Sequence, residues 1–402
     1  MIDTYANGGL EFERFPDLAL RSLGGSVTHA NDELFAEREN LIKPEPSRLL
    51  TSFGNKGGHY DGWETRRRRG PGHDYAVVRL GVPGVIHGVV IDTAHFLGNY
   101  PPYVSVEATS VAGYPSPPEL DNAEWVTIVA KTEAKGGVAN GYACTDPQSY
   151  THVRLSIYPD GGVARFRVHG EPVVDPRFLH GTLDLASLEN GGRVVNCSDT
   201  FYSSPTNILL PDRARDMGEG WETSRRRDDG NDFAVVRLAG AGEVRHVEVD
   251  TSYFVGNAPG WIRLLGAQVA ESRSTPENWF ELVPRTRVCP DTRHRFLTNG
   301  SAPVTHVRLD IYPDGGLARL RVHGELTAAA RAAATTHWFN TLPQSHARLV
   351  LAGCGVDAAD AAHAVSERPY ATPQTLADSF EDMLPALIGQ PRPPVSDPSK
   401  QD

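Results

Sequence analysis

The chain contains one long segment twice, and this duplication limits the folds it can adopt more than any other feature. The block GWETRRRRGPGHDYAVVRL, which starts at Gly62, returns as GWETSRRRDDGNDFAVVRL from Gly220. The match runs on through IDTAHFLGNYPP and VDTSYFVGNAPG, and it resumes with THVRLSIYPDGGVARFRVHGE and THVRLDIYPDGGLARLRVHGE. A period this long indicates two duplicated domains rather than a solenoid. We therefore predict repeat 1 over residues 20–172 and repeat 2 over residues 178–326.

Apolar residues alternate with polar ones inside each repeat. Val153, Leu155 and Ile157 are separated by polar residues, which is the period of a strand with one buried face. The Pro-Asp-Gly-Gly sequence at 159–162 is typical of a hairpin turn. The segments AVVRLG, VIHGVVIDT, YVSVEATSV and WVTIVA indicate further strands. Because 39 Gly and 30 Pro supply many turns, we predict an all-β fold of two tandem sandwiches.

The two ends of the chain differ from the repeats. Residues 1–19 form a separate N-terminal segment before repeat 1. Residues 328–389 are rich in Ala and carry apolar residues at helical spacing, which predicts a small helical appendage. The ending at 390–402 is rich in Pro and charge, and it predicts a disordered tail.

Charge and composition exclude several classes of function. A net charge of −11 makes a nucleic-acid partner improbable, although a local arginine cluster can still bind a small anion. No leader-like segment or membrane-length apolar run is present, so we expect a cytoplasmic protein without a membrane partner. The four cysteines are far apart and lack zinc-like spacing, so we expect free thiols. No cofactor is required by the sequence.

An acid followed by a run of arginines stands in both repeats. Glu64 precedes Arg67 and Arg68, and Glu222 precedes Arg225 and Arg226. Planar guanidinium groups suit the capture of carboxylate or ureido oxygens, so we take these residues as candidates for substrate binding. Because alternate strand residues face opposite ways, no more than two arginines per repeat should reach one ligand. The alternative interpretation is a solvated charge run paired with nearby acids.

Groups able to transfer protons follow in repeat 1. His73 and Asp74 close the loop after the arginines, and His95 lies in the next block with Thr93 and Asn99. Histidine titrates near neutral pH, so we predict proton transfer by His73, His95, Glu64 and Asp74. Thr93, Asn99 and, in repeat 2, Asn257 are predicted to bind substrate through hydroxyl and amide groups. A divalent cation is a further conceivable ligand of these oxygens, but no spacing supports a metal site.

Arginines also stand on a late strand of each repeat. We interpret these residues and the histidines that follow as structural, because strand arginines commonly cover the sheet with their alkyl stems. They are Arg165, Arg167, His169, Arg319, Arg321 and His323.

The motifs GWETRRRR, HDYAVVRLG, IDTAHFLGNYPP and YPDGG resemble the allantoicase family over nearly all of residues 20–326. The resemblance implies two galactose-binding-like jelly-roll sandwiches and the hydrolysis of allantoate to ureidoglycolate and urea. Repeat 2 departs from repeat 1 at Ser224, Asn231 and Tyr253, which replace Arg66, His73 and His95. These departures predict unequal repeats. The site could then lie where repeats or subunits meet, and we expect a homo-oligomer.

Residues 337–389 resemble the beginning of a second family, the OHCU decarboxylases, without the later part that carries the catalytic residues of that family. We therefore expect no decarboxylase activity from the appendage. Two other functions remain open at this stage. One is a non-catalytic β-sandwich that binds a small ligand, because fold alone does not fix function. The other is a lyase acting on ureidoglycolate.

Overall fold

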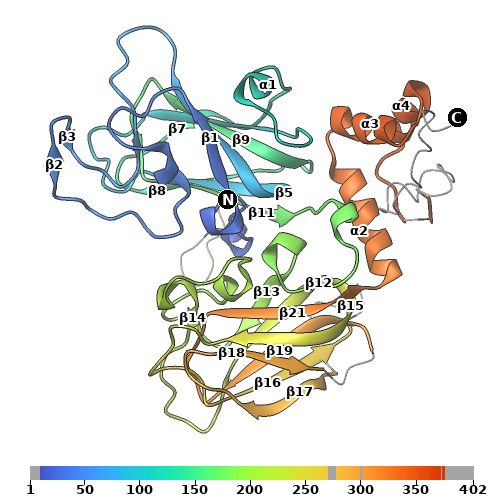
Figure 1. Ribbon diagram of the computed structural model, residues 1–402. Coiled ribbons are helices and arrows are strands. Elements are labelled where there is room, and N and C mark those ends of the chain that lie inside the picture. Colours follow the sequence, from blue (N-terminus) through green and yellow to red (C-terminus); the bar gives the residue numbers. More distant parts are fainter. Residues whose placement is uncertain (1–9, 270–277, 299–301, 373, 376–402) are drawn as a thin grey trace, which may run out of the picture.

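The computed structural model describes residues 10–269, 278–298, 302–372 and 374–375. Within these residues two β-rich domains follow one another, and the C-terminal helices lie beside them (Figure 1). The predicted fold class of tandem β-sandwiches with a small helical appendage is confirmed. The predicted disordered tail and the part of the appendage after residue 375 lie outside the described residues.

Repeat 1 builds its main sheet in the order β1-β5-β9-β6-β7, and β8 and β11 also pair with β5. Two short pairs, β4 with β10 and β2 with β3, lie outside this sheet. The strands are β1 (Ser26–Ala30), β2 (Phe53–Gly54), β3 (Gly57–Gly58), β4 (Trp63–Glu64), β5 (Asp74–Asp92), β6 (Tyr103–Thr109), β7 (Val126–Glu133), β8 (Ala139–Ala143), β9 (Ser149–Tyr158), β10 (Gly162–Val163) and β11 (Arg165–Pro172).

Repeat 2 copies this arrangement, with the order β12-β21-β15-β19-β16-β17 and with β13 and β18 paired to β15. The short pair β14 with β20 corresponds to β4 with β10. The strands are β12 (Leu183–Asp184), β13 (Arg193–Cys197), β14 (Trp221–Glu222), β15 (Asp232–Asp250), β16 (Trp261–Ala267), β17 (Phe280–Arg287), β18 (Arg293–Leu297), β19 (Val304–Tyr312), β20 (Gly316–Leu317) and β21 (Arg319–Leu326).

One long strand links the two groups of strands in each repeat. The sequence indicated two separate strands here, but β5 is continuous over 19 residues. Its first half pairs with β1 and β9, and its second half pairs with β11 and β8. The register against β9 shifts between Arg79 and Gly84, where Pro83 interrupts the sequence pattern without ending the strand. Strand β15 pairs with β19 through its first half and with β21 through its second half. The end of the long strand therefore lies at the equivalent edge of each repeat.

The sandwich core consists of the alternating apolar residues that predicted the strands. Val153, Leu155 and Ile157 of β9 are fully buried, and so are Val307, Leu309 and Ile311 of β19. Burying each such side chain stabilises the fold by roughly 1.5–3 kcal/mol. The alternation therefore sets which residues of each strand face outward, where a site can form.

The helices before residue 327 are short, as the sequence indicated. They are η1 (Glu11–Arg14), η2 (Arg21–Leu23), η3 (Arg38–Ile42), α1 (Pro117–Asp121), η4 (Pro176–Phe178), η5 (Leu188–Asn190), η6 (Pro205–Leu209) and η7 (Met217–Glu219). The appendage contains α2 (Ala328–Thr341), α3 (Gln344–Gly353) and α4 (Ala358–Ser366). Thr327 caps α2 by accepting a hydrogen bond from the Ala330 amide.

Helix α2 contacts both repeats (Figure 1). Its side chains Trp338 and Phe339 share an apolar cluster with Val85 and Val173 of repeat 1. At its start, the Thr327 amide donates to the Ala241 carbonyl of repeat 2 at 2.9 Å. The appendage is therefore packed onto the sandwiches rather than tethered to them.

Candidate functional site

A buried tryptophan fixes the start of the repeated Glu-Arg motif in each repeat. Trp63 is fully buried, and its indole nitrogen donates to the Asp32 carbonyl at 2.7 Å. Trp221 is equally buried and donates to the Asp199 carbonyl at 3.0 Å. The residue after each tryptophan is consequently held at one end of the sandwich. We call this end, with the loop that follows β5 or β15, the rim of each repeat.

A carboxyl and an amide meet at each rim. The Asn99 side chain donates to Glu64 Oε1 at 2.8 Å, and the Asn257 side chain donates to Glu222 Oε1 at 2.7 Å. Burial raises the pKa of Glu64, although the hydrogen bond from Asn99 opposes this rise. A raised pKa favours the protonated form of the carboxyl, which is the form that a general acid needs. The structure thus brings together two predicted residues in each repeat.

The arginine run is divided between ion pairs and solvent. Arg68 pairs with the buried Asp74, and Arg226 pairs with the buried Asp232 at 2.7 Å. Within the part of the chain that the structure describes, no ion pair engages Arg67, which is exposed. Arg68 and Asp74 therefore hold the loop in shape, whereas Arg67 can approach a ligand.

The same division holds in repeat 2. Arg225 is exposed, and no ion pair engages it among the described residues. Each repeat thus has an exposed arginine three residues after the glutamate of its Glu–Asn pair. Guanidinium and amide groups together suit a ligand that carries a carboxylate and amide groups.

Two of the predicted residues lie at the loop after β5 with different surroundings. His95 has a left-handed backbone (φ 70°) and lies 3.2 Å through Nε2 from the Ser47 carbonyl. A non-glycine residue at positive φ is uncommon and is often found at functional sites. Thr93 is fully buried, and its hydroxyl donates to the Lys135 carbonyl at 2.6 Å. Its hydroxyl therefore anchors the loop through the main chain.

His73 belongs to a different hollow. Its ring lies 4.5 Å from that of Tyr158, and both line a cavity of about 450 Å³ with Glu107, Lys131 and Arg154. Burial and the nearby Arg154 lower the pKa of His73. No hydrogen bond or ring contact joins His73 to Glu64 or His95 in the described part of the chain. His73 therefore lines a cavity to which neither Glu64 nor His95 contributes.

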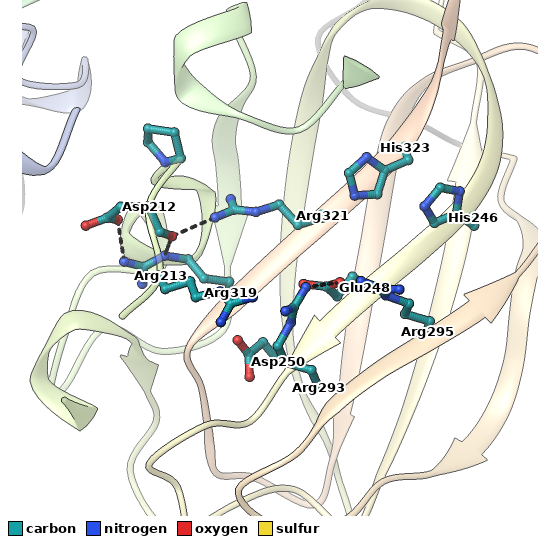
Figure 2. A pocket seen from close by; sticks show the side chains of 11 residues that line it. Asp212, Arg213, His246, Glu248, Asp250, Arg293, Arg295, Arg319, Arg321 and His323 are labelled. Carbon is teal, nitrogen blue, oxygen red and sulfur yellow. Dashed lines mark hydrogen bonds and ion pairs between the residues drawn. The ribbon is translucent and has the colours of Figure 1, made fainter. Parts of the chain in front are cut away.

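A second cavity, which the sequence analysis did not single out, opens on repeat 2 (Figure 2). It includes Arg319, Arg321 and His323, for which we had expected structural roles. The signal that could have revealed it is the difference between repeats: Glu248, Arg293 and Arg295 replace Val90, Ala139 and Gly141.

Neither a metal site nor a membrane span emerges from the described residues. Within ranges 10–269, 278–298, 302–372 and 374–375, no group of three or more His, Cys, Asp or Glu side chains is arranged to hold a metal ion. Among the same residues no helix is long and apolar enough to cross a membrane.

Comparison with known proteins identifies the repeats. The allantoicase repeat family matches residues 16–173 and 183–327. A probable allantoicase of Nocardia farcinica is 55% identical over 320 residues, which cover 78% of this chain and 95% of that protein. A probable allantoicase of Streptomyces coelicolor is 50% identical over 347 residues, covering 82% of this chain and 91% of the relative.

Solved structures agree with the sequence relatives. A crystal structure of allantoicase from Saccharomyces cerevisiae is 36% identical with a TM-score of 0.70, and the match covers 81% of this chain and 99% of the yeast chain. A second allantoicase structure is 37% identical with a TM-score of 0.68, covering 78% of this chain and 93% of the other. The chain belongs to the allantoicase family, and its activity is that of an allantoicase, a hydrolase acting on allantoate.

Proposed function

We propose that the rims carry the hydrolysis of allantoate to ureidoglycolate and urea. In this reaction a C–N bond breaks, water supplies a hydroxyl to the carbon, and the departing urea nitrogen gains a proton. The observation that supports the rim is the Glu64–Asn99 pair, because burial raises the pKa of a carboxyl that accepts a hydrogen bond from an amide. Repeat 2 repeats the same contact with Glu222 and Asn257.

Each group has a proposed role that follows from its contacts. Glu64 protonates the departing urea, and His95 accepts a proton from water or passes it on. Arg67 and Arg225 hold the substrate carboxylate, because planar guanidinium groups bind carboxylates in pairs of hydrogen bonds. The amides of Asn99 and Asn257 recognise ureido groups while they orient the neighbouring glutamates.

The remaining predicted residues act indirectly in this proposal. The ion pairs Arg68–Asp74 and Arg226–Asp232 shape the arginine loops, and Thr93 anchors the loop that presents His95 and Asn99. Glu222 is the counterpart of Glu64 in repeat 2. His73 lines a different cavity. If it takes part in catalysis, the proton must reach it without direct contact with Glu64.

We further propose that rims of different subunits meet in a cytoplasmic homo-oligomer. Leu97 and Val255 occupy equivalent rim positions and are 75% and 68% exposed, and Phe53 of the same end of repeat 1 is 81% exposed. Exposed apolar side chains at one end of a domain are typical of an association surface. The four described cysteines are free thiols, which fits a reducing compartment.

The decisive experiment measures urea release from allantoate by purified chain and by two matched variants, Glu64→Gln and Glu222→Gln. Loss of a general acid typically lowers kcat by about 100-fold or more, so Glu64→Gln should do so while Glu222→Gln should act mainly on KM. Near-normal kcat in a folded Glu64→Gln variant would remove this carboxyl from the mechanism.

A further inference from the structure

The cavity of repeat 2 is lined by residues of β15, β18 and β21 and of the loop at 211–213, and neither Glu222 nor Asn257 lines it. Figure 2 shows its charged side chains pointing into one shared space, with Arg293 and Arg295 beside Glu248 and with the two histidines next to each other. Its volume is about 390 Å³, within the usual range for small-ligand sites. Its lining consists of Pro211, Asp212, Arg213, His246, Glu248, Asp250, Arg293, Arg295, Arg319, Arg321 and His323.

Part of this charge is neutralised inside the protein. Arg293 forms two hydrogen bonds to Glu248 through Nη2, at 2.7 and 2.6 Å, and Arg295 reaches the same carboxylate at 3.1 Å. Although burial opposes it, these bonds lower the pKa of Glu248 and keep it ionised. Arg319 is similarly paired with Asp212 at 2.7 Å.

Donors nevertheless remain for a ligand. Nη1 of Arg321 is buried, lies 3.6 Å from Asp184 and has no hydrogen-bond partner among the described residues. Arg295 is 70% exposed, so most of its guanidinium faces the opening. Arg213 is exposed, and in the described part of the chain no ion pair engages it. Arg213 and Arg295 therefore offer N–H groups to an anion. Arg321 adds positive charge inside the cavity, although its Nη2 donates to the Asp212 carbonyl at 2.8 Å and its Nη1 pairs with Asp184.

Acceptors stand beside these donors. Asp250 and Asp212 line the same cavity, and each has carboxylate oxygens that can accept N–H groups. The rings of His246 and His323 are stacked 4.5 Å apart, and they add groups that can donate or accept. The lining is thus complementary to a molecule that carries both a carboxylate and N–H donors, rather than to a simple anion.

Repeat 1 shows that the fold does not require this charge. At the matching positions it has Gly88, Val90 and Gly141, and Leu10 and Phe12 lie over the two glycines. A Cβ atom at Gly88 would come within 2.3 Å of the Phe12 ring, and one at Gly141 within 1.9 Å of Leu10. The same sheet face is therefore closed by apolar packing in repeat 1 and open and charged in repeat 2.

We propose that the cavity of repeat 2 is a second binding site, separate from the rim, for a small ureido carboxylate. Arg213 and Arg295 would hold its carboxylate, Arg321 would add positive charge behind them, and the acids would accept its ureido N–H groups. The ligand class follows from the mixed lining and from the substrate of the enzyme, and the separation from catalysis rests on the rim assignment proposed above. Allantoate and ureidoglycolate are the two candidate ligands, because each carries a carboxylate and at least one ureido group.

The test uses N-carbamoylglycine, which carries one carboxylate and one ureido group but lacks the second ureido group on the same carbon. Calorimetric titration is performed on the full chain with Glu64→Ala and Glu222→Ala, so that binding at the rims is weakened. We expect saturable binding that becomes at least about tenfold weaker when Arg213→Gln and Arg295→Gln are added, because hydrogen bonds to charged groups are lost. Arg245→Gln, which changes an exposed arginine of β15 that does not line the cavity, is the matched control and should leave binding unchanged.

Hydrogen exchange locates the ligand independently, since β18 should become protected when N-carbamoylglycine binds. Absence of saturable binding in the rim-disabled chain, or binding that survives both cavity substitutions, would overturn the proposal. Acetate, which has only the carboxylate, and urea, which has only the ureido nitrogens, should each bind more weakly than N-carbamoylglycine. Titration with allantoate and with ureidoglycolate then distinguishes the two sources.

Urea release separates this proposal from the rim assignment. If Arg213→Gln and Arg295→Gln weaken binding but leave kcat within about twofold, both proposals stand. If these substitutions abolish turnover while the rim variants remain active, the cavity still binds the ligand but the rim assignment is wrong.

Discussion

At the scale of single residues, His95 is the clearest test of proton transfer. Asparagine tolerates the left-handed backbone that His95 adopts, so His95→Asn removes the imidazole without adding strain. We expect kcat to fall by about 100-fold or more, with the fold intact by circular dichroism. Tyr253→Asn is the matched change at the equivalent position of repeat 2, which has the same φ of 70°, and it should leave kcat nearly unchanged.

His73 provides the contrasting prediction. Because its ring packs against that of Tyr158 in a separate cavity, we expect His73→Asn to alter kcat by less than about tenfold. Steady-state kinetics on His73→Asn and His95→Asn compares the two residues. An equal loss of kcat in both variants would mean that the cavity around His73 also serves the reaction.

His152 gives a prediction about stability and pH. Burial, with help from Arg79, lowers the pKa of His152 to about 4, so the folded chain binds fewer protons than the unfolded chain between pH 4 and 6.5. Stability from this residue is complete above about pH 6.5 and falls as the pH drops toward 4, by up to about 3 kcal/mol. Denaturant unfolding at several pH values should show a shallower fall for His152→Gln than for His59→Gln, an exposed histidine.

Single residues also mark what the sequence could and could not predict. The residues of the pairs Glu64–Asn99 and Glu222–Asn257 were each predicted as site residues because both copies retain them, but their pairing was not predicted. It was not predictable that His73 lines a cavity without His95. The positions of two residues in the sequence do not tell on which side of a sheet each ring lies. The roles themselves stay predictions.

At the scale of elements, the strands were largely predictable because their alternation reflects burial on one face. The continuity of β5 was not, since Pro83 and its flanking glycines have the composition of a turn. Only long-range pairing with β9 and β11 shows that the strand continues through them. The charged cavity of repeat 2 was missed for a related reason, because three separate strands contribute to it.

Deleting helices α3 and α4 tests what they contribute to stability and to activity. A chain that ends after residue 342 keeps α2 but loses the packing of Leu351, Ala361 and Val365 against Phe339. We expect a lower Tm, because apolar surface on α2 becomes exposed. Urea release per folded chain should remain, since neither rim contains appendage residues. An inactive but well-folded and equally assembled truncated chain would show that the appendage contributes to the site.

At the scale of the whole molecule, the apolar rim tips predict assembly. Replacing Leu97 and Val255 together by Ser removes exposed apolar area from both rims without touching the core. We expect a smaller assembly by light scattering after size-exclusion chromatography, with urea release reduced if rims of different subunits complete each site. Leu349→Ser, an equally exposed residue of the appendage, is the control. Unchanged mass in the rim variant would place the association surface elsewhere.

The N-terminal segment over Gly88 and Gly141 has a consequence for how such a duplicated chain can diverge. Tandem duplication copies a domain, but it does not copy what precedes that domain along the chain. The first copy is preceded by Leu10 and Phe12, which lie on its outer face and restrict that face to glycine and aliphatic side chains. The second copy is entered from a linker that leaves the same face uncovered, so charged residues could accumulate there at little cost. The two halves are therefore not interchangeable: if a copy of repeat 2 took the place of repeat 1, Phe12 would meet the counterpart of Gly88, which is His246, and Leu10 would meet the counterpart of Gly141, which is Arg295.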